Sequence, residues 1–222
     1  MTKRKQETYR KLIITCVCTF IALPFPYHLT AKTIEYKDNG KELANKDERT
    51  DSMLVCQLRH KGISFSHNNS VTLLCTGQEK FDDLFKAIDQ ARSSIHLEYF
   101  NFRNDSINDE LIRHLEKKVK QGVEVRAIFD GFGNASNNRP MKKSTLRAIR
   151  KKGIEIYEFK PIEFPWIHDI FNRDHRKIVI IDGKIAYTGG MNVADYYIKG
   201  TKAVGSWHDM HCRIEGDEVN TL

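Results

Sequence analysis

The sequence contains few cysteines, and they are not arranged to bind zinc or to form a disulfide framework. Their number is odd, and no C-x-x-C pair or zinc-ligand spacing occurs among them. A structural zinc site and a disulfide-stapled domain are therefore not indicated. The five cysteines are Cys16, Cys18, Cys56, Cys75 and Cys212.

The sequence also lacks an apolar run long enough to identify a membrane-spanning helix with certainty. Its longest candidate, "LIITCVCTFIAL", follows a basic stretch at residues 3–11 and is broken by Pro24 and Pro26. A basic region before a short apolar run is typical of a secretory signal or a membrane anchor. We therefore expect residues 1–31 to be such a segment, with a buried helix of the main domain as the alternative. Residues 32–62 are polar and are expected to form a connector with at most one short helix.

The overall composition is that of a globular protein with an excess of positive charge. The hydrophobic fraction is 40%, the charged fraction is 29% and the formal net charge is +7, which makes a disordered or fibrous chain improbable. Basic residues gather at 3–11, 113–126 and 139–152. Such a surface attracts anions, for example phospholipid headgroups or nucleic acid, although solubility alone could also explain the charge.

Strand-like and helix-like stretches alternate from about Ser70 onward. Period-2 or β-rich patterns alternate with 3.6-residue apolar periodicity, which predicts a layered α/β domain with a mostly parallel or mixed sheet and helices on both faces. The turn "GK" then joins two β-rich runs into a hairpin. The expected strands are 70–75, 94–102, 123–133, 154–160, 177–182, 185–190 and 206–216, and the expected helices are 79–93, 107–122 and 142–153.

The hairpin carries the residues with the clearest chemical meaning. His175 and Lys177 are two positions apart, so in a strand both side chains project to the same side. Asp182 begins the turn, and the second strand delivers Gly190 and Asn192 beside the first. A lysine can neutralise a phosphate oxygen, a glycine allows close approach of a ligand to the backbone, and a carboxamide can donate to an oxyanion. Because histidine can act as a nucleophile or proton carrier near neutral pH, the set suits phosphoryl chemistry.

This pattern, His-x-Lys-x4-Asp followed by Gly-Gly and Asn, resembles the HKD signature of the phospholipase D superfamily. The resemblance extends over residues 63–222, which we expect to form one phospholipase D-like catalytic domain with a single HKD half. The stretches that resemble the amino-terminal catalytic half of bacterial cardiolipin synthases are "SIHLEYFNFRND", "GVEVRAIFDGFG", "NRDHRKIVIIDGKIAYTGGMNVADYY" and "WHDMHCRIEGDEV".

The resemblance implies a role for each matching residue. His175 would be nucleophile or general acid, Lys177, Gly190 and Asn192 would bind the substrate phosphate, and Asp182 would orient an imidazole. The reaction would join two phosphatidylglycerols into cardiolipin plus glycerol through a phosphohistidine. No metal or other cofactor is expected, since the site is built from cations and not from clustered carboxylates.

Three further positions call for a role from the residues themselves. Glu98 alternates with apolar neighbours, and a carboxylate there could support a site histidine or serve structure alone. His208 and His211 are three apart, so on a strand they would face opposite ways, which disfavours metal ligation and favours structural or pocket-edge roles.

Synthases of this type carry two HKD motifs, whereas this sequence contains one. The second copy would come from an identical chain or from a missing carboxy-terminal half, and the latter, a truncated chain, is the favoured expectation. The expected partners are phosphatidylglycerol or another anionic phospholipid and the bacterial cell membrane, reached through the apolar amino terminus. The alternatives are a dimeric single-motif nuclease or phosphodiesterase and a non-catalytic remnant; the synthase-like flanking segments disfavour a nucleic-acid substrate.

Overall fold

The computed structural model describes residues 49–62, 68–162, 171–203 and 205–222. The chain divides into two units, Met1–Val55 and Cys56–Leu222. The predicted signal or anchor segment lies outside the described residues, as does most of the predicted connector. The connector ends in a helix, α2 (Arg49–His60). None of the described helices combines the length and the apolar character needed to cross a bilayer.

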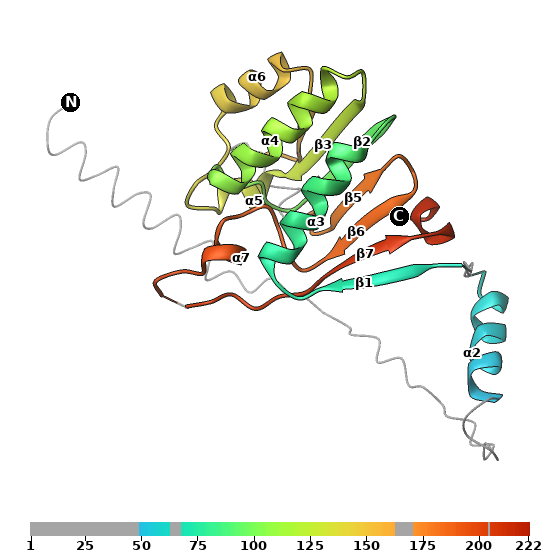
Figure 1. The fold of residues 1–222 in the computed structure, drawn as a ribbon. Helices are drawn as coiled ribbons and strands as arrows, with labels where there is room; N and C mark the ends of the chain where they lie inside the picture. The colour runs from blue at the N-terminus through green and yellow to red at the C-terminus, as the bar shows by residue number, and fades with distance from the viewer. Residues whose placement is uncertain (1–48, 63–67, 163–170, 204) are drawn as a thin grey trace, which may run out of the picture. The chain divides into compact units, whose positions relative to one another are not determined.

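From Ser70 onward the described chain forms one mixed sheet with its helices (Figure 1). Strands and helices alternate up to β4, as the periodicity predicts, and the chain then adds the β5–β6 hairpin and β7. The elements in order are β1 (Ser70–Leu74), α3 (Gly77–Gln90), β2 (Ser94–Tyr99), α4 (Ser106–Val119), β3 (Glu124–Asp130), α5 (Gly131–Ala135), α6 (Lys143–Lys151), β4 (Glu155–Phe159), β5 (Lys177–Ile181), β6 (Ile185–Gly189), α7 (Tyr196–Lys199), β7 (His211–Glu215) and the 3-10 turn η1 (Asp217–Asn220).

The strand order in the seven-stranded sheet is β1-β7-β6-β5-β2-β3-β4. The neighbours β2–β3 and β3–β4 are parallel, and the other described pairs are antiparallel. The expected α/β class with a mixed sheet and flanking helices is confirmed. Antiparallel pairing predominates because β5 pairs antiparallel with β2, the strands β5, β6 and β7 follow one another antiparallel, and β1 joins β7 as the outermost strand and not the parallel group.

The core lies between one face of the sheet and helices α3, α4 and α6, which Figure 1 shows on the near side. Alternate residues of β2 point into it: Ile95, Leu97 and Tyr99 are buried, whereas His96 and Glu98 face the other side and are partly exposed. The sequence predicted helices on both faces. In residues 68–162, 171–203 and 205–222, the helices packed on the sheet cover the face that carries Tyr99.

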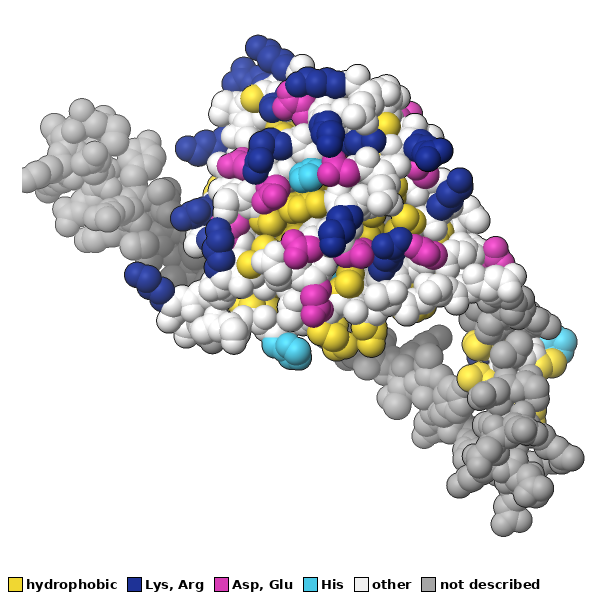
Figure 2. All heavy atoms as spheres, viewed as in Figure 1, with side chains coloured by type: hydrophobic (Ala, Val, Ile, Leu, Met, Phe, Trp, Pro, Cys, Tyr) yellow, Lys and Arg dark blue, Asp and Glu magenta, His cyan; other side chains and the backbone are white. Residues whose placement is uncertain are grey.

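The helix-covered face carries charges of both signs. Figure 2 shows Lys and Arg side chains interspersed with Asp and Glu over α3 and α4. Several of these charges form ion pairs, such as Lys120 with Glu116 and Lys117 with Asp89. This face is therefore not a continuous basic patch of the kind that tracks a nucleic-acid backbone.

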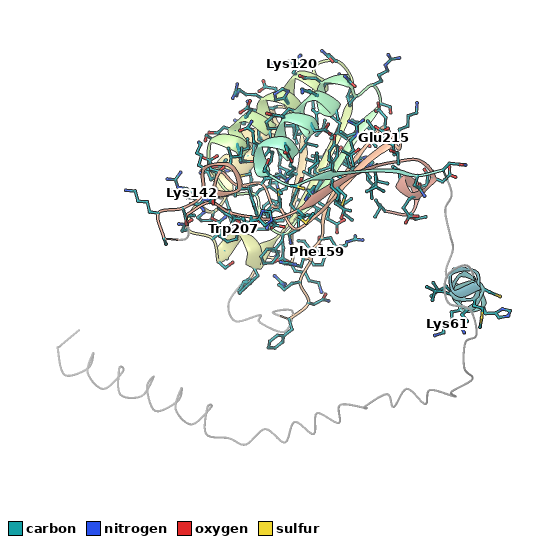
Figure 3. The ribbon with its side chains drawn as sticks, turned by 60° about the horizontal axis from the view of Figure 1, so that its bottom comes forward. Lys61, Lys120, Lys142, Phe159, Trp207 and Glu215 are labelled. Carbon is teal, nitrogen blue, oxygen red and sulfur yellow. The ribbon has the colours of Figure 1, made fainter. Side chains whose placement is uncertain are left out.

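Strand directions bring several strand ends to a single edge of the sheet. Parallel strands β2, β3 and β4 end there, and antiparallel β5 begins there, with Tyr99 opposite Lys177. Strand β6 ends and β7 begins at the same edge, with Gly189 opposite His211. Trp207, which precedes β7, and Phe159, at the end of β4, lie on this side in Figure 3, whereas Glu215 lies on the opposite side. We call this side of the sheet, where these strand ends meet, the site edge.

Candidate active site

His175 and Lys177 meet at the start of β5, as their spacing predicts. Both side chains contact the ring of Phe100: the His175 ring lies 4.7 Å from it between centroids, and Lys177 Nζ lies 5.4 Å from its centroid. Lys177 Nζ also donates to the His175 carbonyl oxygen at 2.7 Å. The histidine is exposed, whereas the lysine is 5% exposed. An accessible imidazole therefore lies above a buried ammonium.

The surroundings favour a neutral imidazole at His175. Partial burial lowers its pKa from 6.5, the Lys177 charge lowers it further, and Asp130 and Asp174 act weakly in the opposite direction. A neutral imidazole has a free lone pair, so it can attack phosphorus near neutral pH. Burial likewise lowers the pKa of Lys177, although Asp174 and Asp209 raise it.

Replacing Lys177 by methionine should raise the pKa of His175, because it removes a nearby cation while retaining most of the side chain's bulk. NMR titration of the His175 ring protons measures this directly and requires no catalytic turnover. Lys184→Met, in the β5–β6 turn at the opposite edge, is the matched control and should leave the His175 pKa unchanged. An unchanged or lower pKa in Lys177→Met would contradict the proximity of the two groups.

Asn192 is held beside the same pair by the residue that follows Phe100. The backbone N–H of Asn101 donates to Asn192 Oδ1 at 3.1 Å, and Asn192 Nδ2 donates to the Tyr197 hydroxyl at 3.3 Å. An amide nitrogen has two hydrogens, so one remains for a ligand. The side chains of His175, Lys177 and Asn192 are thus linked through two consecutive residues, Phe100 and Asn101.

Gly190 allows the chain to pass close to an acidic side chain. A Cβ at Gly190 would lie 2.0 Å from Asp209 Oδ1, and a Cβ at Gly189 would lie 2.6 Å from the His211 Cα. Gly189 also has φ 153°, a conformation that favours glycine. The two glycines are therefore required by close packing of the β6 end against residues 209–211.

Two residues that the sequence analysis did not consider, Asp209 and Lys80, lie near the site together with His211, which was expected to be structural or at the pocket edge. Asp209 lies against Gly190; burial lowers the pKa of both Lys177 and Lys80, and the Asp209 charge opposes that lowering. Lys80, from α3, is fully buried and donates to backbone carbonyls of the β6–α7 turn. His211 is also fully buried, with no hydrogen-bond partner for either ring nitrogen among the described residues. Burial, Lys80 and Lys177 together lower the His211 pKa to about 2, so this imidazole is neutral.

The segment leading into His175 is anchored by Asp130, a fully buried carboxylate at the end of β3. Its Oδ1 accepts from the N–H groups of Phe132 and Gly133 at the start of α5, and its Oδ2 accepts from Asp174 N at 2.9 Å. Arg173 adds an ion pair to the same carboxylate. Asp130 therefore fixes the backbone immediately before His175.

Asp182 does not lie beside an imidazole. It follows Ile181, at the end of β5 opposite the site edge, and its carboxylate accepts from the backbone N–H groups of Arg92, Ser93 and Ser94 and from Ser93 Oγ at 2.7–3.0 Å. Lys177 is the first residue of β5 and Asp182 follows its last, so the strand, at about 3.3 Å per residue, holds the two side chains at opposite ends. The expectation that Asp182 orients an imidazole does not fit this placement; it fastens the α3–β2 connection to the β5–β6 turn.

Glu98 faces the sheet surface away from the core and pairs with Arg176. Arg176 Nε and Nη2 donate to its two oxygens at 2.8 and 2.9 Å. Burial and a hydrogen bond with Asp174 raise the Glu98 pKa, and Arg176 lowers it. Glu98 borders an apolar hollow of about 220 Å³ on that surface, together with Ile178 and Tyr157. It can support the His175 segment through its neighbours but forms no hydrogen bond to the His175 ring among the described residues.

Residues 84–209 match the family described as "Cardiolipin synthase, PLD-like domain". The chain is 42% identical over 171 residues to Cardiolipin synthase 2 of Staphylococcus epidermidis and 40% identical over 171 residues to Cardiolipin synthase of Staphylococcus aureus, covering 76% and 77% of this chain and 34% of each relative. It thus spans about a third of the length of these relatives.

Two solved structures share the fold. NucT from Helicobacter pylori has a TM-score of 0.51 and 18% identity, covering 69% of this chain and 90% of that chain. Phosphatidylserine synthase of Haemophilus influenzae Rd KW20 has a TM-score of 0.54 and 15% identity, covering 68% and 34%. At these identities the likeness concerns the fold alone.

Proposed function

The chain belongs to the cardiolipin synthase group of phospholipase D-like domains, and from that premise we propose that it supplies one HKD half of a phosphatidyltransferase that makes cardiolipin from phosphatidylglycerol. The observation that carries the proposal is the convergence of an exposed neutral imidazole, a buried ammonium and a carboxamide at the site edge. Relatives that bear the name cardiolipin synthase support the choice of reaction.

In the proposed first step, an imidazole nitrogen of His175 attacks the phosphorus of phosphatidylglycerol. The new N–P bond forms as the P–O bond to the headgroup glycerol breaks, and the leaving oxygen takes a proton from a general acid of the second HKD half. Lys177 and the Asn192 amide hold the nonbridging phosphate oxygens, whose charge they stabilise in the transition state. The chain remains as a phosphatidyl-histidine.

In the second step, the free hydroxyl of another phosphatidylglycerol attacks the phosphorus. The N–P bond breaks, the hydroxyl proton passes to the base of the second half, and cardiolipin leaves while His175 returns to its neutral form. Asp130 and Asp174 hold the His175 segment, so the imidazole keeps one position through both steps.

A lipid substrate is supported by exposed apolar side chains around the site edge. Phe171 is 94% exposed, Met210 is 47% exposed, and Phe132 and Trp207 are each 40% exposed. Exposed apolar groups beside a site are typical of surfaces that meet membranes or other apolar partners. We propose the bacterial cell membrane as the place of action, with an anionic phospholipid as substrate and with the second HKD half supplied by another copy or by a further part of the protein.

The test incubates the purified 222-residue chain with phosphatidylglycerol vesicles and measures cardiolipin and glycerol by mass spectrometry. One arm uses the chain alone at a concentration where light scattering reports its oligomeric state. A second arm adds the remaining carboxy-terminal part of Cardiolipin synthase 2 from Staphylococcus epidermidis. Equimolar cardiolipin and glycerol in either arm is the expected result. Absence of both products in both arms would overturn the proposal, and DNA cleavage by a dimer would favour the single-motif nuclease instead.

A further inference from the structure

Lys80 is a charged side chain with no exposure to solvent. It lies on α3, where Leu84 and Ile88 continue the same buried helix face at intervals of four residues. Burying an ammonium is costly unless hydrogen bonds and opposite charge compensate for the lost hydration. The groups that surround the Lys80 ammonium and replace its lost hydration therefore indicate which part of the structure it stabilises.

Those groups belong to the turn that carries Asn192. Lys80 Nζ donates to the carbonyl oxygens of Met191 and Asn192, at 3.2 Å each. It also lies 4.2 Å from the Phe81 ring centroid and 4.9 Å from that of Tyr99, where ring faces attract cations. Burial lowers the Lys80 pKa, and Asp209, packed against Gly190, opposes that change.

Two bonds to consecutive carbonyls define the orientation of the turn. In a trans peptide the C=O and N–H point in opposite directions, so the bond from Lys80 to the Met191 carbonyl turns the Asn192 N–H away from the lysine. On the other side, Val193 N donates to the Asn101 carbonyl at 3.2 Å, and Asn101 N donates to Asn192 Oδ1. Asn192 is thus held between Lys80 and Asn101.

We propose that Lys80 is a positioning residue of the phosphate site, whose ammonium holds the Gly189–Asn192 turn in the shape that presents the Asn192 amide to a phosphate oxygen. It acts through the turn and does not touch the substrate. The inference rests on the proposed function only in taking a phosphate group as the ligand; it does not depend on which alcohol the phosphate is transferred to.

The test measures binding of inorganic phosphate by isothermal titration calorimetry in the full chain, comparing the wild type with Lys80→Met and Lys118→Met. Lys118 is a matched control because it is also buried, at 5% exposure, and donates to a backbone carbonyl, that of Asp89 at 3.1 Å. Both variants lose a buried ammonium. Only Lys80→Met should weaken phosphate binding, by about tenfold or more, which is the loss expected for misplacing one charge-assisted donor.

Several outcomes decide the matter. The single substitution Lys177→Met should abolish phosphate binding, which would show that the titrated phosphate binds at the site of His175 and Lys177. Equal phosphate affinity in the wild type and Lys80→Met overturns the inference, as does a wild type that binds no phosphate at tens of millimolar. If Lys80→Met does not fold, Lys80→Gln retains an amide donor and is expected to give an intermediate affinity. Phosphate binding that depends on Lys80, without cardiolipin formation, would reject the proposed reaction and leave the positioning role intact.

Discussion

Replacing His175 by alanine is expected to abolish cardiolipin formation in any mixture where the wild-type chain supports it. The loss should be about 10⁴-fold or more, as when a covalent nucleophile or its base is removed from an enzyme. The histidine side chain is exposed, and its ring contact is with Phe100, so thermal stability should change little. Mass spectrometry at alkaline pH should detect a phosphatidyl adduct on His175 in the wild type and none in the variant.

His96→Ala is the matched control for this prediction. His96 is partly exposed and lies on the sheet surface away from the core, where its ring forms a hydrogen bond with Glu124 at 3.0 Å. Its removal should leave both cardiolipin formation and the adduct unchanged. A His175→Ala chain that keeps more than a tenth of the wild-type rate would show that another group is the nucleophile.

The lowered His175 pKa gives the reaction a predictable acid limb. Because the nucleophile must be neutral, the rate of adduct formation should fall only when the pH drops below the ordinary histidine value of 6.5. Desolvation of the imidazole is the largest cause of the lowered His175 pKa, and the charge of Lys177 adds to it. The burial of His175 and its neighbour Lys177 therefore set the pH at which the rate begins to fall.

The sequence predicted individual strands, helices and the hairpin, because these depend on neighbouring residues along the chain. The alternation in 94–102, the helical periodicity in 79–93 and the turn residues of the hairpin each correspond to an observed element. The spacing of His175 and Lys177 predicted a shared side on a strand; β5 begins only at Lys177, and the two side chains come together against the Phe100 ring. The membership in the phospholipase D superfamily followed from the same stretch.

The long-range pairings of the fold could not be predicted in this way. The antiparallel pairing of β1 with β7 joins residues about 140 positions apart, and nothing in either strand specifies its partner. The role of Lys80 left a faint signal, since it lies four residues before Leu84 on the apolar face of its helix. A lysine on such a face is unusual, but the carbonyls that explain it are more than 100 residues away.

The residues of the HKD pattern lie at the two ends of one strand, β5. His175 and Lys177 lie at the site edge, and Asp182 lies at the opposite end of β5. The four residues between Lys177 and Asp182 are the rest of β5, which crosses the core, and Val179 and Ile181 among them are buried. The pattern thus combines two residues proposed to act on the phosphate, His175 and Lys177, with an aspartate, Asp182, that fixes the other end of the same strand.

Replacing Asp182 by alanine is accordingly expected to reduce stability more than any other substitution at an HKD position, by about 3 kcal/mol. The change removes hydrogen bonds to an ionised acceptor, worth roughly 1.5–3 kcal/mol, and places alanine at φ 54°, which costs about 1 kcal/mol more. Asp182→Asn should cost about half as much, because asparagine tolerates this conformation and keeps one acceptor oxygen. Urea denaturation measures the difference, and Asp109→Ala, an exposed aspartate of α4, should change stability by at most ~0.5 kcal/mol.

The pH dependence provides an independent check on the same residue. Burial alone would raise the Asp182 pKa, but hydrogen bonds from Ser94, Ser93 and Arg92 lower it to about 2. A carboxylate with a lowered pKa contributes stability above its unfolded pKa of about 3.9, and the contribution is lost as pH falls toward 2. Asp182→Ala should therefore flatten the fall in unfolding free energy between about pH 4 and pH 2, and should leave the NMR-measured pKa of His175 unchanged. A lowered His175 pKa in this variant would instead mean that Asp182 acts on the imidazole, because removing a neighbouring carboxylate destabilises the charged form of histidine.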